Sequence, residues 1–339
     1  MKHSIVFSVR SFAVLADAAR FVERRGLDRA WVTETPGRDA LMRAVEVAGR
    51  TERIGVGTGI AYAFTRHPLA AAAAAIEANE LTGGRLTLGI GSGPADFRSA
   101  LGVEFDRPAA RLGEYLTLVR QALVATDGID FRGEFYSAAL QTFGSAVPPQ
   151  RREAIRVYGS GMSPTSLRVM GRVAHGIALH PLGAFPPYLD EVALPAIASS
   201  GGTPAVAAWC VTSIDPDAGR ALREARTRLA LYLSVPGLSR VASGTRWEAD
   251  VTKLQEAAPA HNERPDWNAL GELVPEALAH ELAVIGTPEE AAQKLAARAR
   301  ELQRRGIDEM VLQPAAMGGS DADVLATIEA TAAAWDGVR

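Results

Sequence analysis

A glycine-serine turn between a predicted strand and a predicted helix is the clearest candidate for chemistry, in "VYGSGMSPTSL" at residues 157–167. Gly159 and Gly161 would let a ligand approach the backbone closely, and Ser160 adds a hydroxyl donor. The first turn of the following helix offers unpaired N–H groups and a dipole that favours anions. The pattern therefore predicts a phosphate site for a mononucleotide-like cofactor, with a merely well-capped turn as the alternative. No Gly-Lys-Ser/Thr follows, so this is not a Walker A loop.

Glycines also gather at the ends of two other predicted strands, in "GTGI" at 57–60 and "GIGSG" at 89–93. Glycine weakens the interior of a strand and often marks the close approach of a ligand or of another backbone. One alternative is that small residues are needed there for packing. Three such clusters at strand ends predict a flat cofactor that lies across them.

Polar side chains at other strand ends extend the candidate site. Glu34 could accept hydrogen bonds from the ring or ribityl groups of a cofactor, or it could pair with Arg38 or Arg66. Arg66 is a candidate for an anionic ligand, whereas the neighbouring His67 is expected to begin a helix. His180 ends another strand, either in contact with substrate or as a satisfied histidine at the rim.

Other chemistries find little support in the sequence. The six histidines show no HExxH or other short ligand spacing, so no metal site is predicted. The single cysteine, Cys210, excludes an intramolecular disulfide and is expected to be buried in a strand. No GxSxG nucleophile motif occurs. These observations favour catalysis by a bound organic cofactor.

The elements that must position these residues alternate along the chain. Helix-like segments separate short apolar runs, which implies a parallel sheet because parallel strands need crossover connections. Eight such runs predict a closed α/β barrel, a (β/α)8 TIM barrel with insertions, whose active site lies at the carboxyl ends of its strands. A doubly wound open sheet is the alternative. The predicted strands are 4–9, 29–34, 53–60, 85–93, 155–161, 176–182, 205–213 and 309–314.

A single domain over residues 1–339 is expected, because barrels of this size are often undivided and no stretch looks like a linker. Two insertions interrupt the pattern, at about 127–152 and about 234–284. The net charge of −3 gives no basic footprint for nucleic acid. The amino terminus is too polar for a signal peptide, and no apolar run is long enough to span a membrane. A soluble, cytoplasmic protein is therefore expected.

The stretch "RIGVGTGIAYAFTRHPLAAAAAAIEANELTGGRLTLGIGSG" at 53–93 resembles the signature region of the bacterial luciferase-like superfamily. It is most similar to the branch of oxidoreductases that depend on coenzyme F420, a deazaflavin. "GLDRAWVTE", "VYGSGMSP", "VAHGIALHPL", "GTPEEAAQKL" and "GIDEMVLQP" follow that family's order, so the resemblance covers nearly the whole chain. It implies the same (β/α)8 barrel.

The resemblance also implies roles for residues of the third strand and of the one before it. The third strand typically ends in a bulge with a non-proline cis peptide that backs the cofactor ring, here Gly59–Ile60. Glu34 stands where an acidic residue usually contacts the ring. Thr35 stands where many members have histidine, which removes a common proton donor. Tyr62 stands where a residue contacting the ring or tail is usual.

Two further segments match the family's cofactor-binding loops. Gly93 and Pro94 match the loop after the fourth strand, although some members have glutamate where Pro94 stands. Gly159, Ser160 and Gly161 match the phosphate-binding turn.

The function implied is an F420-dependent oxidoreductase that moves a hydride between deazaflavin C5 and a small organic substrate. Tyr62 and His180 are the candidates for proton delivery. The alternatives are an FMN-dependent monooxygenase that receives reduced flavin from a separate reductase, and a non-catalytic relative. Arginines at the rim such as Arg66 and Arg98 would suit the acidic tail of F420.

Substrate choice is expected to depend on the 234–284 insertion, where Trp247, His261 and Trp267 could cover the barrel mouth. Lid packing or a subunit interface are alternatives for these three side chains. The resemblance implies a homo-oligomer, a dimer or larger, without fixing its size.

Overall fold

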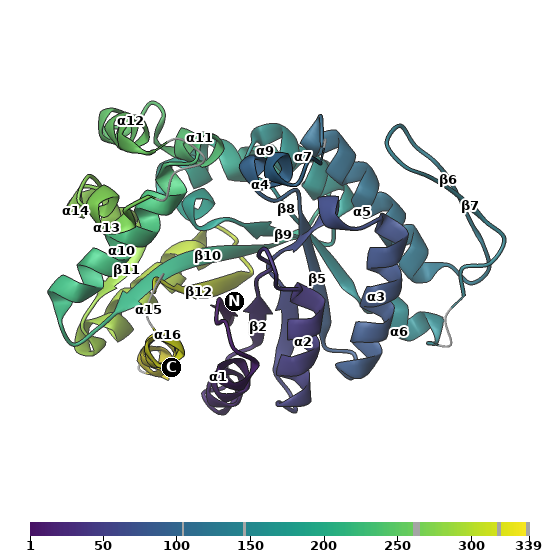
Figure 1. Cartoon of the computed structure of the whole chain (residues 1–339), viewed down its shortest axis with the longest axis horizontal. Helices are drawn as coiled ribbons and strands as arrows, with labels where there is room; N and C mark the ends of the chain where they lie inside the picture. The colour runs from purple at the N-terminus through teal and green to yellow at the C-terminus, as the bar shows by residue number, and fades with distance from the viewer. Residues whose placement is uncertain (104, 145–146, 260–264, 317–319, 337–339) are drawn as a thin grey trace. The chain divides into compact units, whose positions relative to one another are not determined.

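Parallel strands alternate with helices along the chain in the computed structural model (Figure 1), which describes residues 1–103, 105–144, 147–259, 265–316 and 320–336. The predicted (β/α)8 barrel is confirmed, and each expected strand forms within a few residues of its predicted bounds. The eight barrel strands are β1 (Lys2–Phe7), β2 (Arg29–Val32), β3 (Gly55–Thr58), β5 (Leu86–Gly91), β8 (Arg156–Ser160), β9 (Gly176–Leu179), β10 (Ala205–Ile214) and β12 (Glu309–Pro314).

The chain divides into two compact units, which we describe separately. Unit 1 comprises Met1–Leu27, Leu179–Leu194 and Ala207–Arg339, and unit 2 comprises Asp28–Ala178 and Pro195–Val206. The single domain expected from the sequence stays a prediction.

Unit 2 contains the strands that carry most of the candidate site. Their order is β2–β3–β5–β8–β9, and all neighbours are parallel. Val32 pairs with Thr58, and Gly91 pairs with Ser160, so the carboxyl ends of these strands share one edge. The helices that connect the strands are α2 (Ala40–Gly49), α3 (Pro68–Leu81), α4 (Ala95–Ala100), α5 (Pro108–Val124), α6 (Pro149–Glu153) and α7 (Pro164–Val173).

Local signals set the beginnings of these helices. The side chains of Asp39, His67 and Ser163 each accept a hydrogen bond from a backbone N–H in the first turn of α2, α3 and α7. Proline occupies the first turn of α3 and α7, where its missing N–H costs nothing. The expectation that His67 begins a helix is confirmed.

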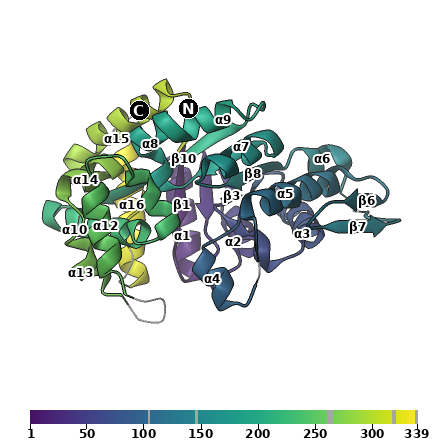
Figure 2. The ribbon, with the colours of Figure 1, turned by 90° about the horizontal axis from the view of Figure 1, so that it is seen from above.

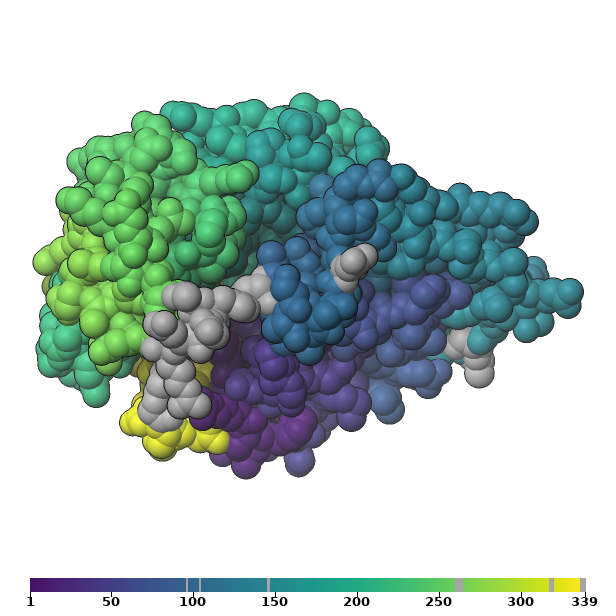
Figure 3. Space-filling model, turned by 45° about the horizontal axis from the view of Figure 1, so that its top comes forward, coloured from purple at the N-terminus to yellow at the C-terminus, as the bar shows by residue number. Residues whose placement is uncertain are grey.

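The insertion at 127–152 forms an antiparallel hairpin of β6 (Ile129–Arg132) and β7 (Ser137–Leu140). The hairpin projects from unit 2 beyond α3 and α5, and the space-filling view shows it as a protrusion (Figures 2 and 3). Glu114 of α5 holds the turn of the hairpin, because its carboxylate accepts hydrogen bonds from the N–H groups of Glu134, Phe135 and Tyr136.

Unit 1 contains the remaining strands, in the order β11–β10–β12–β1 and all parallel. The short strand β11 (Ala283–Gly286) was not predicted, and it pairs with the carboxyl end of β10. Cys210 is buried in β10, as expected. The long helices of this unit are α1 (Phe12–Arg24), α10 (Ala218–Leu233), α15 (Pro288–Arg304) and α16 (Asp321–Asp336).

The insertion at 234–284 is helical, with α11 (Pro236–Ser239), α12 (Glu248–Ala257), α13 (Trp267–Gly271) and α14 (Glu276–Leu282). Trp247 packs within this insertion: its Nε1–H donates to Glu281 at 3.0 Å, and the Arg246 guanidinium lies over its ring. Trp267 begins α13, and His261 lies outside the described residues. In the described part of the chain, each helix is too short or too polar to cross a lipid bilayer.

Candidate active site

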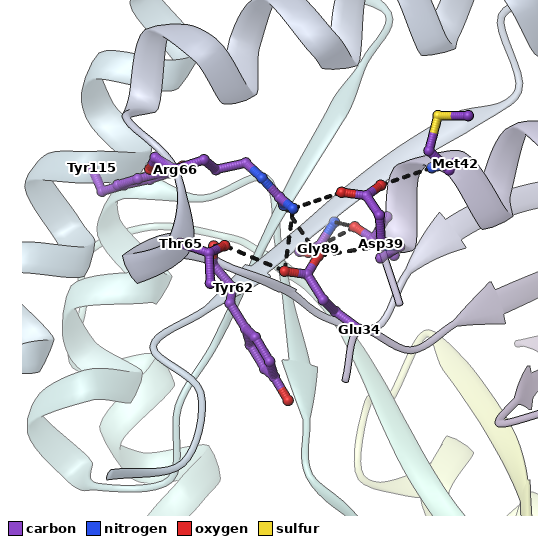
Figure 4. A network of polar contacts seen from close by, with 10 residues as sticks. Glu34, Asp39, Met42, Tyr62, Thr65, Arg66, Gly89 and Tyr115 are labelled. Atoms are coloured by element: carbon purple, nitrogen blue, oxygen red, sulfur yellow. Dashed lines mark hydrogen bonds and ion pairs between the residues drawn. The ribbon is translucent and has the colours of Figure 1, made fainter. Parts of the chain in front are cut away.

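The carboxyl edge of unit 2 brings together most of the residues that the sequence singled out. Glu34 follows β2, Gly59 and Ile60 follow β3, Gly93 follows β5, and Ser160 ends β8. Parallel strands end at the same edge of a sheet, so residues far apart in sequence become neighbours here. Figure 4 shows the polar part of this edge.

Close packing accounts for several glycines of this edge. A Cβ at Gly89 would collide with the Thr58 carbonyl, at Gly159 with the Met170 sulfur, and at Gly161 with Ser166. Gly57 similarly leaves room for the ring of Trp31, which is completely buried. The packing alternative drawn from the sequence therefore applies to these positions.

A bulge separates β3 from the short strand β4 (Ala61–Tyr62). Gly57 pairs with Thr87 and Ala61 pairs with Ile90, so a step of four residues runs opposite a step of three in β5. One extra residue of this kind is a β-bulge, a feature that re-aims side chains near active sites. The peptide bond between Gly59 and Ile60, within the bulge, is cis.

The ring of Tyr62 lies on an aromatic cluster, while its carbonyl accepts a hydrogen bond from the Thr65 hydroxyl at 2.9 Å. Its ring stacks on Phe64 at 5.2 Å between centroids and lies tilted against Phe97 at 5.6 Å. In Figure 4 its side chain points away from the side chain of Arg66. Gly93 packs against Tyr62 and Phe64 of this cluster. Its φ of 61° is a backbone conformation that residues other than glycine rarely adopt.

Arg98 of α4 fastens the loop that carries Gly93 and Pro94. Its Nη1 donates to the carbonyls of Ser92 at 2.8 Å and of Gly93 at 2.6 Å. Pro94 is exposed and precedes the first residue of α4. The guanidinium thus has a structural role in shaping this loop.

Glu34 is the centre of the polar network and is only 7% exposed. Arg66 binds both of its oxygens, with Nη1 to Oε2 at 3.1 Å and Nη2 to Oε1 at 3.2 Å. Thr65 donates its hydroxyl to Oε1 at 3.3 Å, and the Ala40 N–H donates to Oε2 at 3.5 Å. The pairing of Glu34 with Arg66, one of the two alternatives drawn from the sequence, is therefore observed.

Two residues that the sequence did not single out hold Arg66 in place. Asp39, the residue that caps α2, accepts a second bond from Nη2 at 2.8 Å. Tyr115 of α5 donates its hydroxyl to the Arg66 carbonyl at 3.2 Å. Burial raises the pKa of Tyr115, so the phenol keeps its proton and remains a donor. In the sequence, Asp39 could have been identified only as a residue that caps a helix, and nothing in the sequence indicated a role for Tyr115.

A tight turn after Glu34 leaves one hydroxyl without a partner. Thr35 and Arg38 exchange two backbone hydrogen bonds around Pro36 and Gly37, and Gly37 has a φ of 80°. Proline and then glycine at these positions are typical of a type II turn. The Thr35 Oγ1 is buried, and within the described residues no hydrogen-bond partner reaches it.

The glycine-serine turn after β8 leads into a capped helix. Ser163 Oγ accepts from the Ser166 N–H at 3.1 Å and lies 2.9 Å from the Ser166 hydroxyl. Ser160 is half-buried at the end of β8. The hydroxyls of this turn are polar groups of the kind that bind a phosphate, and the cap itself already uses one N–H of the first turn.

His180 belongs to unit 1 and begins the short helix Pro181–Ala184. Its Nδ1 accepts from the Leu182 N–H at 3.2 Å, so Nε2 carries the ring proton. Its ring meets Tyr232 of α10 edge to face at 4.6 Å, and the Tyr232 hydroxyl accepts from Gln313. Burial lowers the pKa of His180 to about 3, so the imidazole is neutral at neutral pH.

The described residues include no group of three or more His, Cys, Asp or Glu side chains placed to hold a metal ion. The polar groups described at the carboxyl edge of unit 2 are hydroxyls, the Glu34 and Asp39 carboxylates, the Arg66 guanidinium and backbone amides. This donor set is suited to hydrogen bonding with an organic ligand.

Comparison with known proteins agrees with this architecture. The family model described as luciferase-like monooxygenase matches residues 3–308. A 5,10-methylenetetrahydromethanopterin reductase of Methanolobus tindarius is 26% identical over 310 residues, which are 88% of this chain and 89% of that protein.

Two solved structures share the fold. The coenzyme F420 dependent tetrahydromethanopterin reductase of Methanopyrus kandleri superposes with a TM-score of 0.76 at 20% identity, over 97% of both chains. An F420-dependent secondary alcohol dehydrogenase in complex with an F420-acetone adduct superposes with a TM-score of 0.73 at 16% identity, over the whole of both chains. With its barrel and nearly its full length matched, this chain belongs to the luciferase-like monooxygenase family.

Proposed function

We propose that this protein is an F420-dependent oxidoreductase that transfers a hydride between deazaflavin C5 and a small organic substrate. The observation that carries the proposal is the buried hydroxyl of Thr35, which has no hydrogen-bond partner among the described residues, beside the fixed carboxylate of Glu34. A buried hydroxyl without a partner is costly, and a polar ligand at this edge would supply one. The F420-dependent enzymes of the same fold, and the related reductase, support the choice of cofactor.

The residues present fit such a cofactor along the carboxyl edge of unit 2. Glu34 and Thr35 would bind polar atoms of the ring, and the bulge at Gly59 and Ile60 would back its face. Tyr62, Gly93 and Pro94 would border the ring and the start of the tail. The phosphate would bind at the turn of Gly159, Ser160 and Gly161.

Bound F420 would supply the hydride chemistry itself. The contribution of the protein is orientation: the Arg66 pair holds the Glu34 carboxylate in one position, and holding reactants in a reactive geometry supplies much of the rate gain. The Arg66 guanidinium already forms ion pairs with Glu34 and Asp39, so few of its donors are left for an acidic tail. The tail is therefore expected to depend less on Arg66 than the sequence suggested.

For proton delivery, Tyr62 and His180 remain the proposed residues. The neutral form of His180 can donate a hydrogen bond from Nε2–H but carries no second proton to release. Of the two, the Tyr62 hydroxyl is therefore the proposed donor, and His180 is the proposed substrate contact.

A second candidate function is an FMN-dependent monooxygenase, which is favoured by the name of the family model that the chain matches. This enzyme would take reduced flavin from a separate reductase and use O₂. The third alternative is a barrel without catalytic activity.

For each enzyme proposal we further propose a cytoplasmic homo-oligomer, with the 234–284 insertion over the barrel mouth. Light scattering would measure the assembly.

Titration of tryptophan fluorescence with F420 and with FMN, each in oxidised form, distinguishes these functions. We expect saturable quenching with F420 at concentrations at least tenfold lower than with FMN. Preference for FMN would replace the first proposal with the second. Binding of neither cofactor to the folded protein would contradict both.

Thr35→Val tests the observation on which the proposal depends, because it removes the hydroxyl and keeps the shape. Loss of one hydrogen bond to the cofactor predicts a roughly five- to tenfold weaker affinity for F420. Thr126→Val is the matched control, since Thr126 is exposed and, among the described residues, its hydroxyl bonds to its neighbour Asp127 alone. Equal affinities of the Thr35 variant and of the control would remove Thr35 from the site.

A further inference from the structure

A cavity lies in unit 2, at the edge opposite to the candidate active site. Its volume is about 580 Å³, and it lies among the carboxyl-terminal parts of α5, α6 and α7 and the residues that precede β8 and β9. The charged and titratable side chains that line it are Arg120, Arg152, Arg172, His175 and Glu153. We call it the arginine pocket.

The arginines of this pocket use few of their N–H donors. Arg120 donates once, from Nη1 to the Val173 carbonyl at 2.5 Å. Arg152 is 3% exposed and donates once, from Nη1 to the Ala125 carbonyl at 2.6 Å. The Nε of Arg152 is buried at the cavity wall and has no hydrogen-bond partner among the described residues. A guanidinium has five N–H groups, so most donors of Arg120 and Arg152 have no acceptor in the part of the chain that the structure describes.

Arg85 shows what an arginine with a purely structural role looks like in the same unit. It precedes β5, near the same edge, and donates five hydrogen bonds. The acceptors are four backbone carbonyls and one hydroxyl, those of Ala48, Thr51, Ile54 and Thr82. Arg120 and Arg152 each make one such bond, so binding helix carbonyls explains only part of their donor capacity.

His175 lines the arginine pocket, and its pKa is affected by the arginines around it. Its Nδ1 accepts from the Val157 N–H at 3.0 Å, so Nε2 carries the proton and can donate. Burial, together with the charges of Arg120 and Arg156, lowers the pKa of His175 to about 4. The charges of the two arginines contribute to this shift after burial, and among the described residues that line the pocket Glu153 is the acidic one.

We propose that the arginine pocket binds a small phosphorylated molecule, with its phosphate held by Arg120, Arg152 and Arg172. Guanidinium groups bind phosphate through paired N–H donors. The volume is in the range of small-molecule sites and exceeds what inorganic phosphate fills, so the ligand has an organic part. Leu123, Val124 and Ile155 form apolar walls for that part.

This site is separate from the proposed cofactor turn. Ile155 precedes β8, whereas Ser160 ends it, so the two sites lie at opposite edges of the same strand. The inference does not depend on which cofactor the active site binds.

Isothermal titration calorimetry with pyrophosphate, with adenosine monophosphate and with uncharged adenosine tests the proposal. We expect one saturable site for the two phosphorylated compounds and none for adenosine. Arg172→Gln should weaken binding at least tenfold, since Arg172 is exposed and has no side-chain partner among the described residues. Arg152→Lys keeps the charge but loses the paired N–H donors of the guanidinium, and we expect the affinity for the phosphorylated compounds to fall about three- to tenfold.

Two matched controls separate the pocket from other sources of anion binding. Arg132→Gln removes the same charge from a side chain that is 84% exposed on the hairpin, and Ser163→Ala alters the proposed cofactor turn. Both should bind within twofold of the unaltered protein. In a histidine-labelled sample, the pKa of His175 should rise when pyrophosphate binds, because a nearby anion favours the charged imidazole.

The proposal is overturned if neither phosphorylated compound binds, or if Arg172→Gln binds as well as the unaltered protein. An equal loss in Arg132→Gln would also overturn it, because the binding would then reflect net charge. So would a loss in Ser163→Ala without a loss in Arg172→Gln, which would place the phosphate at the opposite edge.

Discussion

Arg66 binds Glu34 through both terminal nitrogens of its guanidinium, at 3.1 and 3.2 Å, across 32 positions of sequence. The side chain of Glu34 is 6% exposed and that of Arg66 20%, so both are largely withdrawn from water. Tyr115 and Asp39 add further bonds to Arg66, so α5, the residues that follow β4 and the start of α2 all contribute to this ion pair (Figure 4). Fixed in this way, the Glu34 carboxylate is held in one position.

Removal of Arg66 is expected to be costly for stability. In Arg66→Met, Glu34 would stay buried with its charge unpaired, and we expect the free energy of unfolding to fall by about 3 kcal/mol. Asp39→Asn is the control: it keeps an acceptor to cap α2 and removes an ion pair whose acidic partner is 42% exposed, at a cost of about 0.5 kcal/mol. Urea unfolding measures the free energy of both variants. Equal losses of stability would mean that the buried Glu34–Arg66 pair matters no more than the exposed Asp39–Arg66 pair.

Close packing at the carboxyl edge predicts a strong effect of a single methyl group. Thr58 and Gly89 exchange hydrogen bonds at 2.7 and 2.9 Å, and a Cβ at Gly89 would collide with the Thr58 carbonyl. We expect Gly89→Ala to destabilise the protein by about 2 kcal/mol. Gly49→Ala, at the end of α2 with open space around it, should stay within about 0.5 kcal/mol of the unaltered protein in the same thermal unfolding experiment. A tolerated alanine at 89 would argue against this tight contact.

The two serines of the turn after β8 should separate stability from binding. Ser163→Ala removes the cap of α7 and should lower the free energy of unfolding by about 1 kcal/mol. Ser160→Ala should leave stability unchanged and weaken the proposed cofactor several-fold, because Ser160 caps no helix. Calorimetric unfolding together with the fluorescence titration measures both effects. If Ser160→Ala binds the cofactor normally, its hydroxyl has no part in the phosphate site.

The neutral state of His180 makes stability depend on pH in a defined direction. Its pKa is about 3 in the folded protein, compared with roughly 6.5 in an unfolded chain. Between these values the unfolded state binds more protons, so the contribution is complete above about pH 6.5 and is lost as the pH falls toward 3. His180→Gln should therefore flatten the decline in stability between pH 6.5 and 4. His280→Gln, a change at a side chain that is 44% exposed, serves as the control and should leave the decline unchanged.

Local pattern was enough to predict the barrel strands and the helices between them, but not β11 or the hairpin of β6 and β7. Alternating apolar runs and amphipathic helices gave the eight strands of the barrel, and the caps at His67 and Ser163 are set by their immediate neighbours. Boundaries differed where a proline intervened. The strand expected over 29–34 ends at Val32 because the turn at Thr35 and Pro36 follows, and the one expected over 176–182 ends at Leu179 because Pro181 opens a short helix.

Only the tertiary structure decided which of these residues meet. The sequence named Glu34 and Arg66 as candidates but left two partners open for the carboxylate, since nothing local distinguishes Arg38 from Arg66. The Tyr115 bond joins residues 49 positions apart, and the arginine pocket combines side chains of α5, α6 and α7, which no short-range preference encodes. Periodicity specifies which face of an element is buried, whereas contacts between elements follow from how the parallel strands align their ends.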